Sequence, residues 1–369
     1  MDPDTERFTP EPIPLSLITG FLGSGKTTLI NRLLSRGDMD ETAILVNEFG
    51  EIGLDHLLVQ QVSEDIVLLQ SGCICCTVSG ELVDSLRELF VRRVRGEIPA
   101  FRRVVVETTG LADPAPIIHT LMADPTLEER YRLDGVVTTV DARHGSGQLD
   151  THPESVKQAA VADRIVLTKA DVAEPELVAR LRARLAALNP GAPVITAEHG
   201  NVAPAALFDA GLFDPRTKTA DVERWLNEEA YARGRRDPGH GHGHGHEHEH
   251  EHEQDHEHHD VNRHDARIRT FCLTAAQPIA WERFAEWIEM LLSTQGDKML
   301  RVKGILNVAG ADAPIAIHGV QTMFHAPTAL PAWPNADVRS RIVFITRDLG
   351  QGAIEDSFRA FVTDPQPAE

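Results

Sequence analysis

A glycine-rich loop followed by a lysine and two threonines is the first set of residues whose types and spacing could do chemistry. It reads GFLGSGKTT at residues 20–28, and such a loop between a strand and a helix cradles nucleotide phosphates with its backbone N–H groups. We expect Lys26 to reach the β- and γ-phosphates and Thr27 to ligate Mg²⁺. The residues expected to hold the nucleotide here are Gly20, Gly23, Ser24, Gly25, Lys26, Thr27 and Thr28.

Three cysteines within four residues form the second set. Cys73, Cys75 and Cys76 would present thiolates, which favour Zn²⁺, Cu⁺ and, less strictly, Co²⁺ and Ni²⁺. Because three cysteines cannot complete a tetrahedral site, a fourth ligand must come from Glu48 or Glu51, from water or from a partner protein. An incomplete site suits a metal ion that is passed on. A permanent structural zinc site and a reactive redox thiol are the alternatives.

Two further polar segments follow apolar runs. Glu107 and Gly110 lie in the segment RVVVETTG at 103–110, where we expect the carboxylate to hold a Mg²⁺-bound water and the glycine amide to contact the γ-phosphate. Together with Lys26 and Thr27, Glu107 makes up the expected catalytic group. The alternative is a strand that simply ends in polar residues.

The segment TKAD at 168–171 has a lysine and an aspartate at the spacing that recognises guanine. The carboxylate of Asp171 would accept hydrogen bonds from N1–H and the 2-amino group of guanine, whereas adenine would leave that charge unpaired. We therefore expect GTP rather than ATP as the ligand, with Thr168 and Lys169 as neighbouring nucleotide contacts.

Short apolar runs alternate with helical patterns around these motifs. The runs that predict strands cover 15–19, 42–46, 66–69, 103–106, 135–140, 164–167 and 193–196. Amphipathic patterns predict helices at 80–95 and 175–188. This alternation is typical of an α/β fold with a mostly parallel sheet covered on both faces.

A histidine-rich tract divides the chain. Residues 239–264 hold eleven of the eighteen histidines, and a segment of this composition cannot bury a core. The predicted organisation is a disordered N-terminus at 1–13, a P-loop GTPase domain at 14–236, a histidine-rich disordered linker at 237–265 and a small α+β domain at 266–365. Its imidazoles suggest buffering or capture of metal ions, and a merely tolerated linker is the alternative.

The segment after the tract has a pattern of its own. We expect a strand at 268–273, a helix at 280–292, three strands at 299–308, 315–320 and 341–346, and a helix at 353–361. A small sheet with its helices on one face accommodates this order.

Composition narrows the class of partner and compartment. A net charge of −20 and a pI near 5.3 disfavour nucleic acid and anionic membrane surfaces. The chain begins without a basic and then apolar leader and has no run of eighteen apolar residues. A cytoplasmic protein is therefore expected.

The motifs together resemble those of the CobW family of metal-chaperone GTPases. The segments that carry the resemblance are those at 20–28, 46–53, 72–77, 107–114, 168–171, 298–304 and 342–345. The resemblance implies a P-loop GTPase, related to the nickel-insertion GTPases for hydrogenase and urease, that binds Zn²⁺ or Co²⁺ through the Cys-x-Cys-Cys motif. Thr168 stands where the family has asparagine, which leaves the base specificity partly open.

The function implied is that of a GTP-hydrolysing chaperone that binds Zn²⁺, or Co²⁺, in a GTP-dependent way and delivers it to a client metalloprotein. Self-association into a homodimer is compatible with the sequence. The alternatives are a cobalt-handling GTPase of cobalamin biosynthesis, and a metal buffer or sensor that uses the histidine-rich tract. A small-molecule kinase is disfavoured, because phosphoryl transfer to such a substrate requires neither the TKAD segment nor the cysteines.

Overall fold

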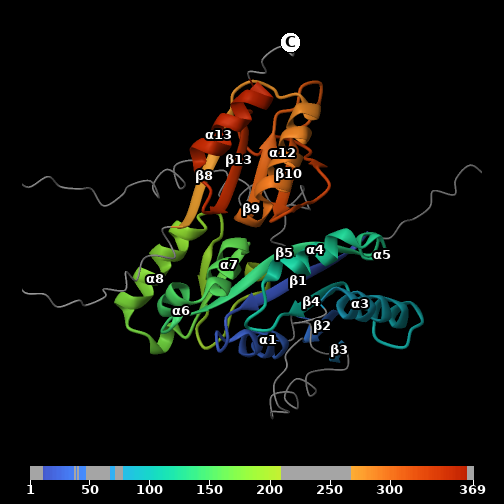
Figure 1. The fold of residues 1–369 in the computed structure, drawn as a ribbon. Coiled ribbons are helices and arrows are strands. Elements are labelled where there is room, and N and C mark those ends of the chain that lie inside the picture. Colours follow the sequence, from blue (N-terminus) through green and yellow to red (C-terminus); the bar gives the residue numbers. More distant parts are fainter. Residues whose placement is uncertain are drawn as a thin grey trace, which may run out of the picture.

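Two domains make up the part of the chain that the computed structural model describes. The described residues are 11–36, 39, 41–46, 78–208 and 267–363, with the backbone alone at 67–70. The first domain, up to residue 208, is α/β and the second, from residue 267, is α+β (Figure 1). This confirms the predicted fold class. The predicted linker at 237–265 lies outside the described residues, and the first strand begins at Ile13, inside the predicted N-terminal tail.

A parallel sheet forms the centre of the first domain. Its strands, in the spatial order β3-β2-β4-β1-β5-β6-β7, are all parallel to their neighbours. All seven strands predicted from the apolar runs are present. Their bounds are β1 Ile13–Gly20, β2 Thr42–Val46, β3 Val67–Gln70, β4 Arg103–Glu107, β5 Tyr131–Asp141, β6 Arg164–Thr168 and β7 Val194–Thr196.

Helices cover both faces of this sheet, as Figure 1 shows. Leu15 and Leu17 of β1 pack on the side that carries α3, α4 and α7, whereas Ile18 packs with α1 and α9 on the other side, because successive strand residues face opposite ways. The helices are α1 Lys26–Leu34, α3 Val78–Val94, α4 Pro114–Ala123, α5 Pro125–Glu128, α6 Gly145–Thr151, α7 Pro153–Val161, the 3₁₀ turn η1 Ala170–Val172, α8 Pro175–Leu188 and α9 Pro204–Leu207.

The predicted helices at 80–95 and 175–188 are confirmed as α3 and α8. Helix α4 was not predicted because its sequence, PAPIIHTLMA, is apolar on almost every side and gives no helical period. Its start is well defined: Pro114 occupies the first turn, and the side chain of Asp113 accepts a hydrogen bond from the Ala115 amide at 3.0 Å. Proline and an N-capping aspartate both favour a helix N-terminus.

The second domain is an antiparallel sheet with helices α12 Trp281–Gln295 and α13 Gln351–Phe358 on one face. Trp287 of α12 is fully buried against Phe344 of the sheet. The predicted order of strand, helix, three strands and helix is confirmed, and two paired dipeptides, β11 and β12, are additional. The strands are β8 Ile268–Ala275, β9 Met299–Leu306, β10 Ile315–Val320, β11 Met323–Phe324, β12 Thr328–Ala329 and β13 Ser340–Arg347.

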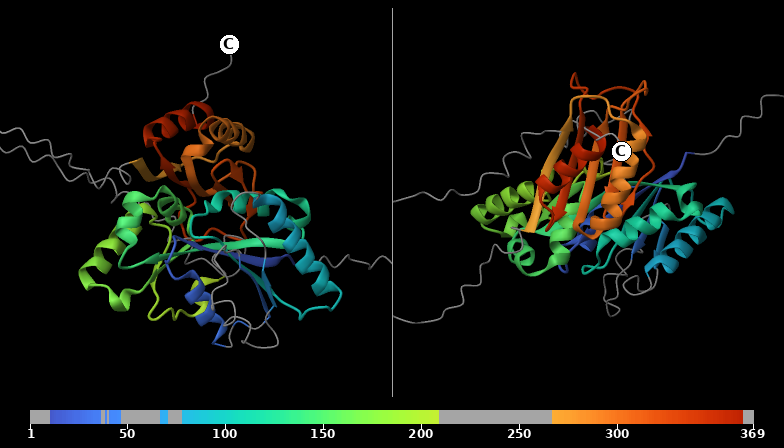
Figure 2. Two further views of the ribbon diagram at one scale, coloured as in Figure 1. Left: turned by 60° about the horizontal axis from the view of Figure 1, so that its bottom comes forward. Right: turned by 45° about the horizontal axis from the view of Figure 1, so that its top comes forward.

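The second domain stands on the side of the first that carries α4 and α7, as Figures 1 and 2 show. Helix α7 packs against β9, and Val320 of β10 joins the apolar core of the first domain. No helix in the described part of the chain is both long and apolar enough to cross a membrane.

A buried carboxylate joins the two domains. Asp163, which directly precedes β6, accepts hydrogen bonds from the backbone N–H of Val136 at 2.9 Å, from the guanidinium of Arg301 at 2.5 Å and from the ammonium of Lys303. Burial opposes ionisation of Asp163, but the charges of Arg301 and Lys303 outweigh it and hold the pKa of Asp163 well below its usual range. The carboxylate is therefore ionised at the interface between the domains.

Replacing Asp163 by asparagine should weaken this interface strongly. The change leaves the cations of Arg301 and Lys303 buried without their counter-charge, and breaking a buried pair in this way costs about 3 kcal/mol or more. The free energy of unfolding in urea should fall by that amount. The matched control is Asp84→Asn, which removes an exposed ion pair of 3.9 Å with Arg87 and should leave the stability nearly unchanged. An equal effect of the two substitutions would contradict the assignment.

The stability should also depend on pH through Asp163. Because its pKa is lower in the folded protein than in the unfolded chain, the folded state binds fewer protons. The stabilisation is therefore present above the ordinary value of 3.8 and decreases as the pH falls below it. Urea unfolding of the parent protein and of Asp163→Asn between pH 3 and pH 6 should show the two stabilities converging as the solution is made acidic, whereas a constant difference would contradict this assignment.

Candidate nucleotide-binding site

The loop between β1 and α1 has the backbone that a phosphate cradle requires. Gly20, Gly23 and Gly25 have φ values of 143°, 70° and 90°, which side chains disfavour. A Cβ at Gly20 would lie 2.3 Å from the hydroxyl oxygen of Thr139. The loop then passes into α1 at Lys26, so that backbone N–H groups at a helix N-terminus surround the position expected for an anion.

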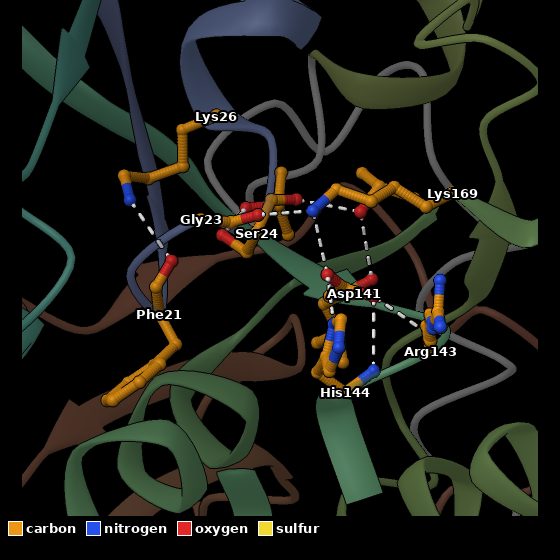
Figure 3. A network of polar contacts seen from close by, with 11 residues as sticks. Phe21, Gly23, Ser24, Lys26, Asp141, Arg143, His144 and Lys169 are labelled. Carbon is orange, nitrogen blue, oxygen red and sulfur yellow. Dashed lines mark hydrogen bonds and ion pairs between the residues drawn. The ribbon is translucent and has the colours of Figure 1, made fainter.

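The side chain of Lys26 is held within this loop (Figure 3). Its ammonium group is nearly buried and donates to the carbonyl oxygens of Gly20 at 2.9 Å and Phe21 at 3.3 Å. The lysine therefore places a positive charge in the cradle, where phosphate oxygens are expected.

The structure brings together Thr27 of α1 and Glu107 at the end of β4, which are eighty residues apart. The Thr27 hydroxyl donates to the Glu107 carboxylate at 2.9 Å, and Glu107 is fully buried. Hydroxyl and carboxylate oxygens are ligands that suit Mg²⁺. This donor set therefore fits the expected magnesium ion beside the phosphate cradle.

Gly110 packs directly on the same loop. A Cβ at this position would lie 2.7 Å from the backbone nitrogen of Leu22. Just before it, the hydroxyl of Thr108 donates to the hydroxyl of Thr19 at 2.9 Å and fixes the segment after β4 to the end of β1. Gly110 is therefore close to the cradle for a structural reason, and no larger residue fits without a shift of the backbone.

Thr168, the last residue of β6, and Lys169 and Asp171 after it make different contacts. The hydroxyl of Thr168 donates to the carbonyl of Ser24 at 2.7 Å, and the ammonium of Lys169 donates to the carbonyl of Gly23 at 2.8 Å. Thr168 and Lys169 thus hold the phosphate loop. Asp171 lies in η1, where its carboxylate is partly exposed and 3.1 Å from Nδ1 of His199. Asp171 thus differs in its contacts from Thr168 and Lys169, which both bond to the phosphate loop, and its contact with the base stays a prediction.

Asp141, the last residue of β5, is a second anchor of the site that was not predicted from the sequence (Figure 3). Its carboxylate accepts from Lys169 at 2.8 Å, from His144 at 3.1 Å and from the backbone N–H of Arg143 at 2.8 Å. Burial opposes ionisation, but the hydrogen bonds from Lys169 and His144 outweigh it and lower the pKa of Asp141. The sequence feature that could have identified Asp141 is an apolar run that ends in an acidic residue, since β5 ends in Asp141 as β4 ends in Glu107.

The predicted metal ligands Cys73, Cys75, Cys76, Glu48 and Glu51 lie outside the described residues. Within the described ranges, no group of three or more histidine, cysteine or acidic side chains is arranged to hold a metal ion.

Comparison with known proteins places both domains in one family. Residues 14–196 match the family model "CobW/HypB/UreG, nucleotide-binding domain", and residues 268–362 match "Cobalamin synthesis protein cobW C-terminal domain". The chain is 34% identical over 348 residues to the zinc chaperone YjiA of Escherichia coli, covering 94% of this chain and 98% of that protein. The chain belongs to the CobW/HypB/UreG family of GTPases.

The crystal structure of YjiA and one other relative extend the comparison. The crystal structure of Zn(II)-bound YjiA GTPase from E. coli superposes on this family member with a TM-score of 0.68 at 30% identity, covering 95% of this chain and 99% of the other. The zinc-regulated GTPase metalloprotein activator 1 of Schizosaccharomyces pombe is 32% identical over 201 residues, which is 53% of this chain and 48% of that protein. The likeness to YjiA thus spans both domains.

Replacing Gly110 by alanine should impair GTP hydrolysis. The added methyl group would contact the backbone of Leu22 at 2.7 Å, so the loop must move away from the cradle. We expect turnover at saturating GTP to fall by about tenfold or more. The control is Gly147→Ala in α6, where a Cβ would have no neighbour within 4 Å. Equal turnover of the two variants would contradict the close approach of Gly110.

Proposed function

We propose that this CobW-family GTPase is a zinc chaperone that binds Zn²⁺ through Cys73, Cys75 and Cys76 when GTP is bound, and delivers the ion to a client metalloprotein. GTP binding and hydrolysis would take place at the site built by β1, β4 and β6. The likeness to YjiA, which is named a zinc chaperone and matches over nearly the whole chain, supports zinc as the cargo.

The observation that carries the proposal is the register of three strand ends. Val46, the last residue of β2, pairs with Gln70 at the end of β3 and with Glu107 at the end of β4. The segment with Glu48 and Glu51 continues from β2, and the segment with the cysteines continues from β3. Strand β2 therefore ends beside Glu107, the residue that contacts Thr27 of the phosphate loop, and β3 ends one strand further from it.

The chain's own groups suggest how hydrolysis would proceed. Lys26 would neutralise charge on the β- and γ-phosphates, and Thr27 and Glu107 would hold Mg²⁺ and its water. When bound there, magnesium would supply neutralisation of the charge that develops on the phosphate oxygens. The N–H of Gly110 would contact the γ-phosphate. Departure of that phosphate after hydrolysis would then release the loop after β4. The neighbouring segments after β2 and β3 would then relax and hold the metal ion less tightly.

Base specificity provides a test of the nucleotide assignment. In Asp171→Asn one of the two acceptor oxygens is replaced by an N–H donor, so the side chain cannot accept from both N1–H and the 2-amino group of guanine, whereas the donor suits the 2-oxo group of xanthine. We expect GTP affinity to fall by about a hundredfold or more and xanthosine triphosphate affinity to rise. Competition with a fluorescent nucleotide would measure both, with Asp150→Asn in α6 as a control. Unchanged GTP affinity would contradict guanine recognition by Asp171.

Metal affinity in two nucleotide states tests the proposed coupling. The zinc affinity of the protein without residues 239–264 should be measured by competition with a chromophoric chelator, first with Mg²⁺-GTP bound and then with Mg²⁺-GDP bound. Zinc affinity should be at least about tenfold higher with GTP, and Cys75→Ser should abolish the difference. Equal affinities in the two states would exclude a GTP-gated chaperone. Repeating the titration with Co²⁺ tests the cobalt alternative, which tighter GTP-dependent binding of Co²⁺ would favour.

The histidine-rich tract supports a second candidate, a metal buffer or sensor. Its eleven histidines offer many imidazole ligands for Zn²⁺. Deleting residues 239–264 discriminates between the two functions, because a buffer loses most of its bound zinc whereas a chaperone keeps one tight site.

A further inference from the structure

Gln158 of α7 is a fully buried side chain bonded to the loop that carries Gly110. Its amide nitrogen donates to the carbonyl of Gly110 at 3.2 Å and to that of Ala112 at 3.0 Å. Because both neighbours are carbonyl oxygens, the nitrogen of the amide must face the loop. The amide oxygen is then buried with no hydrogen-bond partner among the described residues. Such an unsatisfied group destabilises a fold, which points to a role other than stability.

The rest of α7 contacts the same region. The ammonium of Lys157 is 2.6 Å from the carboxylate of Asp113, which ends this loop and caps α4. At the start of α7, the ring of His152 stacks on Phe21 of the phosphate loop with a centroid separation of 4.4 Å. Helix α7 is therefore attached both to the phosphate loop and to both ends of the segment 110–113.

The hydrogen bond from Gln158 to the Gly110 carbonyl matters because Gly110 has no side chain to restrict its backbone. Glycine has more backbone freedom than any other residue, and packing against Leu22 limits its position but does not fix its peptide planes. The hydrogen bond from Gln158 fixes the peptide that follows Gly110. With Thr108 bonded to Thr19 on the other side, the Gly110 N–H is held between two anchored points.

We propose that Gln158 is a positioning residue for GTP hydrolysis, which orients the Gly110 loop so that its N–H faces the γ-phosphate. This inference rests on the proposed function, in which Gly110 contacts that phosphate. Gln158 touches neither nucleotide nor metal and acts through the loop. It should therefore affect turnover and the distinction between GTP and GDP, and leave GDP binding intact.

The test compares two substitutions in the full-length protein. Gln158→Met keeps the approximate size and removes the donor to the loop. The matched control is Asn189→Leu, since the amide of Asn189 donates to the carbonyls of Ala159, Ala160 and Ala162 at the other end of α7. Turnover at saturating GTP, affinity for GDP and for a non-hydrolysable GTP analogue, and amide hydrogen exchange of residues 108–113 are measured for both and for the parent protein.

Gln158→Met should lower turnover by about tenfold to a hundredfold and change GDP affinity by less than about twofold. The exchange protection of 108–113 that the GTP analogue confers should be lost in this variant alone. Unchanged turnover in Gln158→Met, or the same loss in Asn189→Leu, would overturn the proposal, since the role would then be absent or merely structural. No GTP hydrolysis in the parent protein would instead contradict the proposed function itself.

Discussion

The carboxyl edge of the parallel sheet, where β4, β1, β5 and β6 end in this order, is the constraint on which the site depends. The phosphate loop leaves β1 with backbone angles that only glycine adopts easily. It is then held from two other strands, because Glu107 at the end of β4 accepts from the Thr27 hydroxyl and the Thr168 hydroxyl at the end of β6 donates to the Ser24 carbonyl. Because parallel strands deliver their ends to one edge, residues far apart in the sequence meet there.

The same edge explains how metal and nucleotide could influence each other. In the sequence, the segments with the proposed metal ligands follow β2 and β3. Strand β2 ends in register with Glu107 of β4, and β3 ends in register with β2. A change at the γ-phosphate would therefore have to reach the ends of the next two strands. Helix α7 contacts both the loop after β4 and strand β9 of the second domain, so one helix connects the second domain to the loop that carries Gly110.

Much of this structure could be predicted from the sequence because its signals are local. Apolar runs located all seven strands of the first sheet, and glycine spacing located the phosphate loop. The contacts of Asp141, Gln158 and Asp163 could not be predicted in this way. Asp163 pairs with Arg301 across 138 residues, and only the folded arrangement of two domains makes that carboxylate a buried interface residue.

Thr168 illustrates the intermediate case. Its place after an apolar run and before Lys169 predicted a nucleotide contact, but the structure uses its hydroxyl to hold the carbonyl of Ser24 at 2.7 Å. Sequence spacing can assign a residue to a site, whereas the atom that it contacts depends on the angle at which the strand meets the loop. Helix α4 escaped prediction because its sequence is apolar at nearly every position and so shows no helical period, although Pro116 and His119 are exposed in the structure.

Coupling between nucleotide and zinc can be tested most directly from the nucleotide side, because binding linkage is reciprocal. GTP-analogue and GDP affinities should be measured in the protein without residues 239–264, with and without one equivalent of Zn²⁺. If the two sites are coupled, Zn²⁺ should tighten binding of the GTP analogue over that of GDP by the same factor by which GTP tightens zinc, about tenfold or more. Nucleotide affinities that do not respond to Zn²⁺ would contradict a GTP-gated metal chaperone.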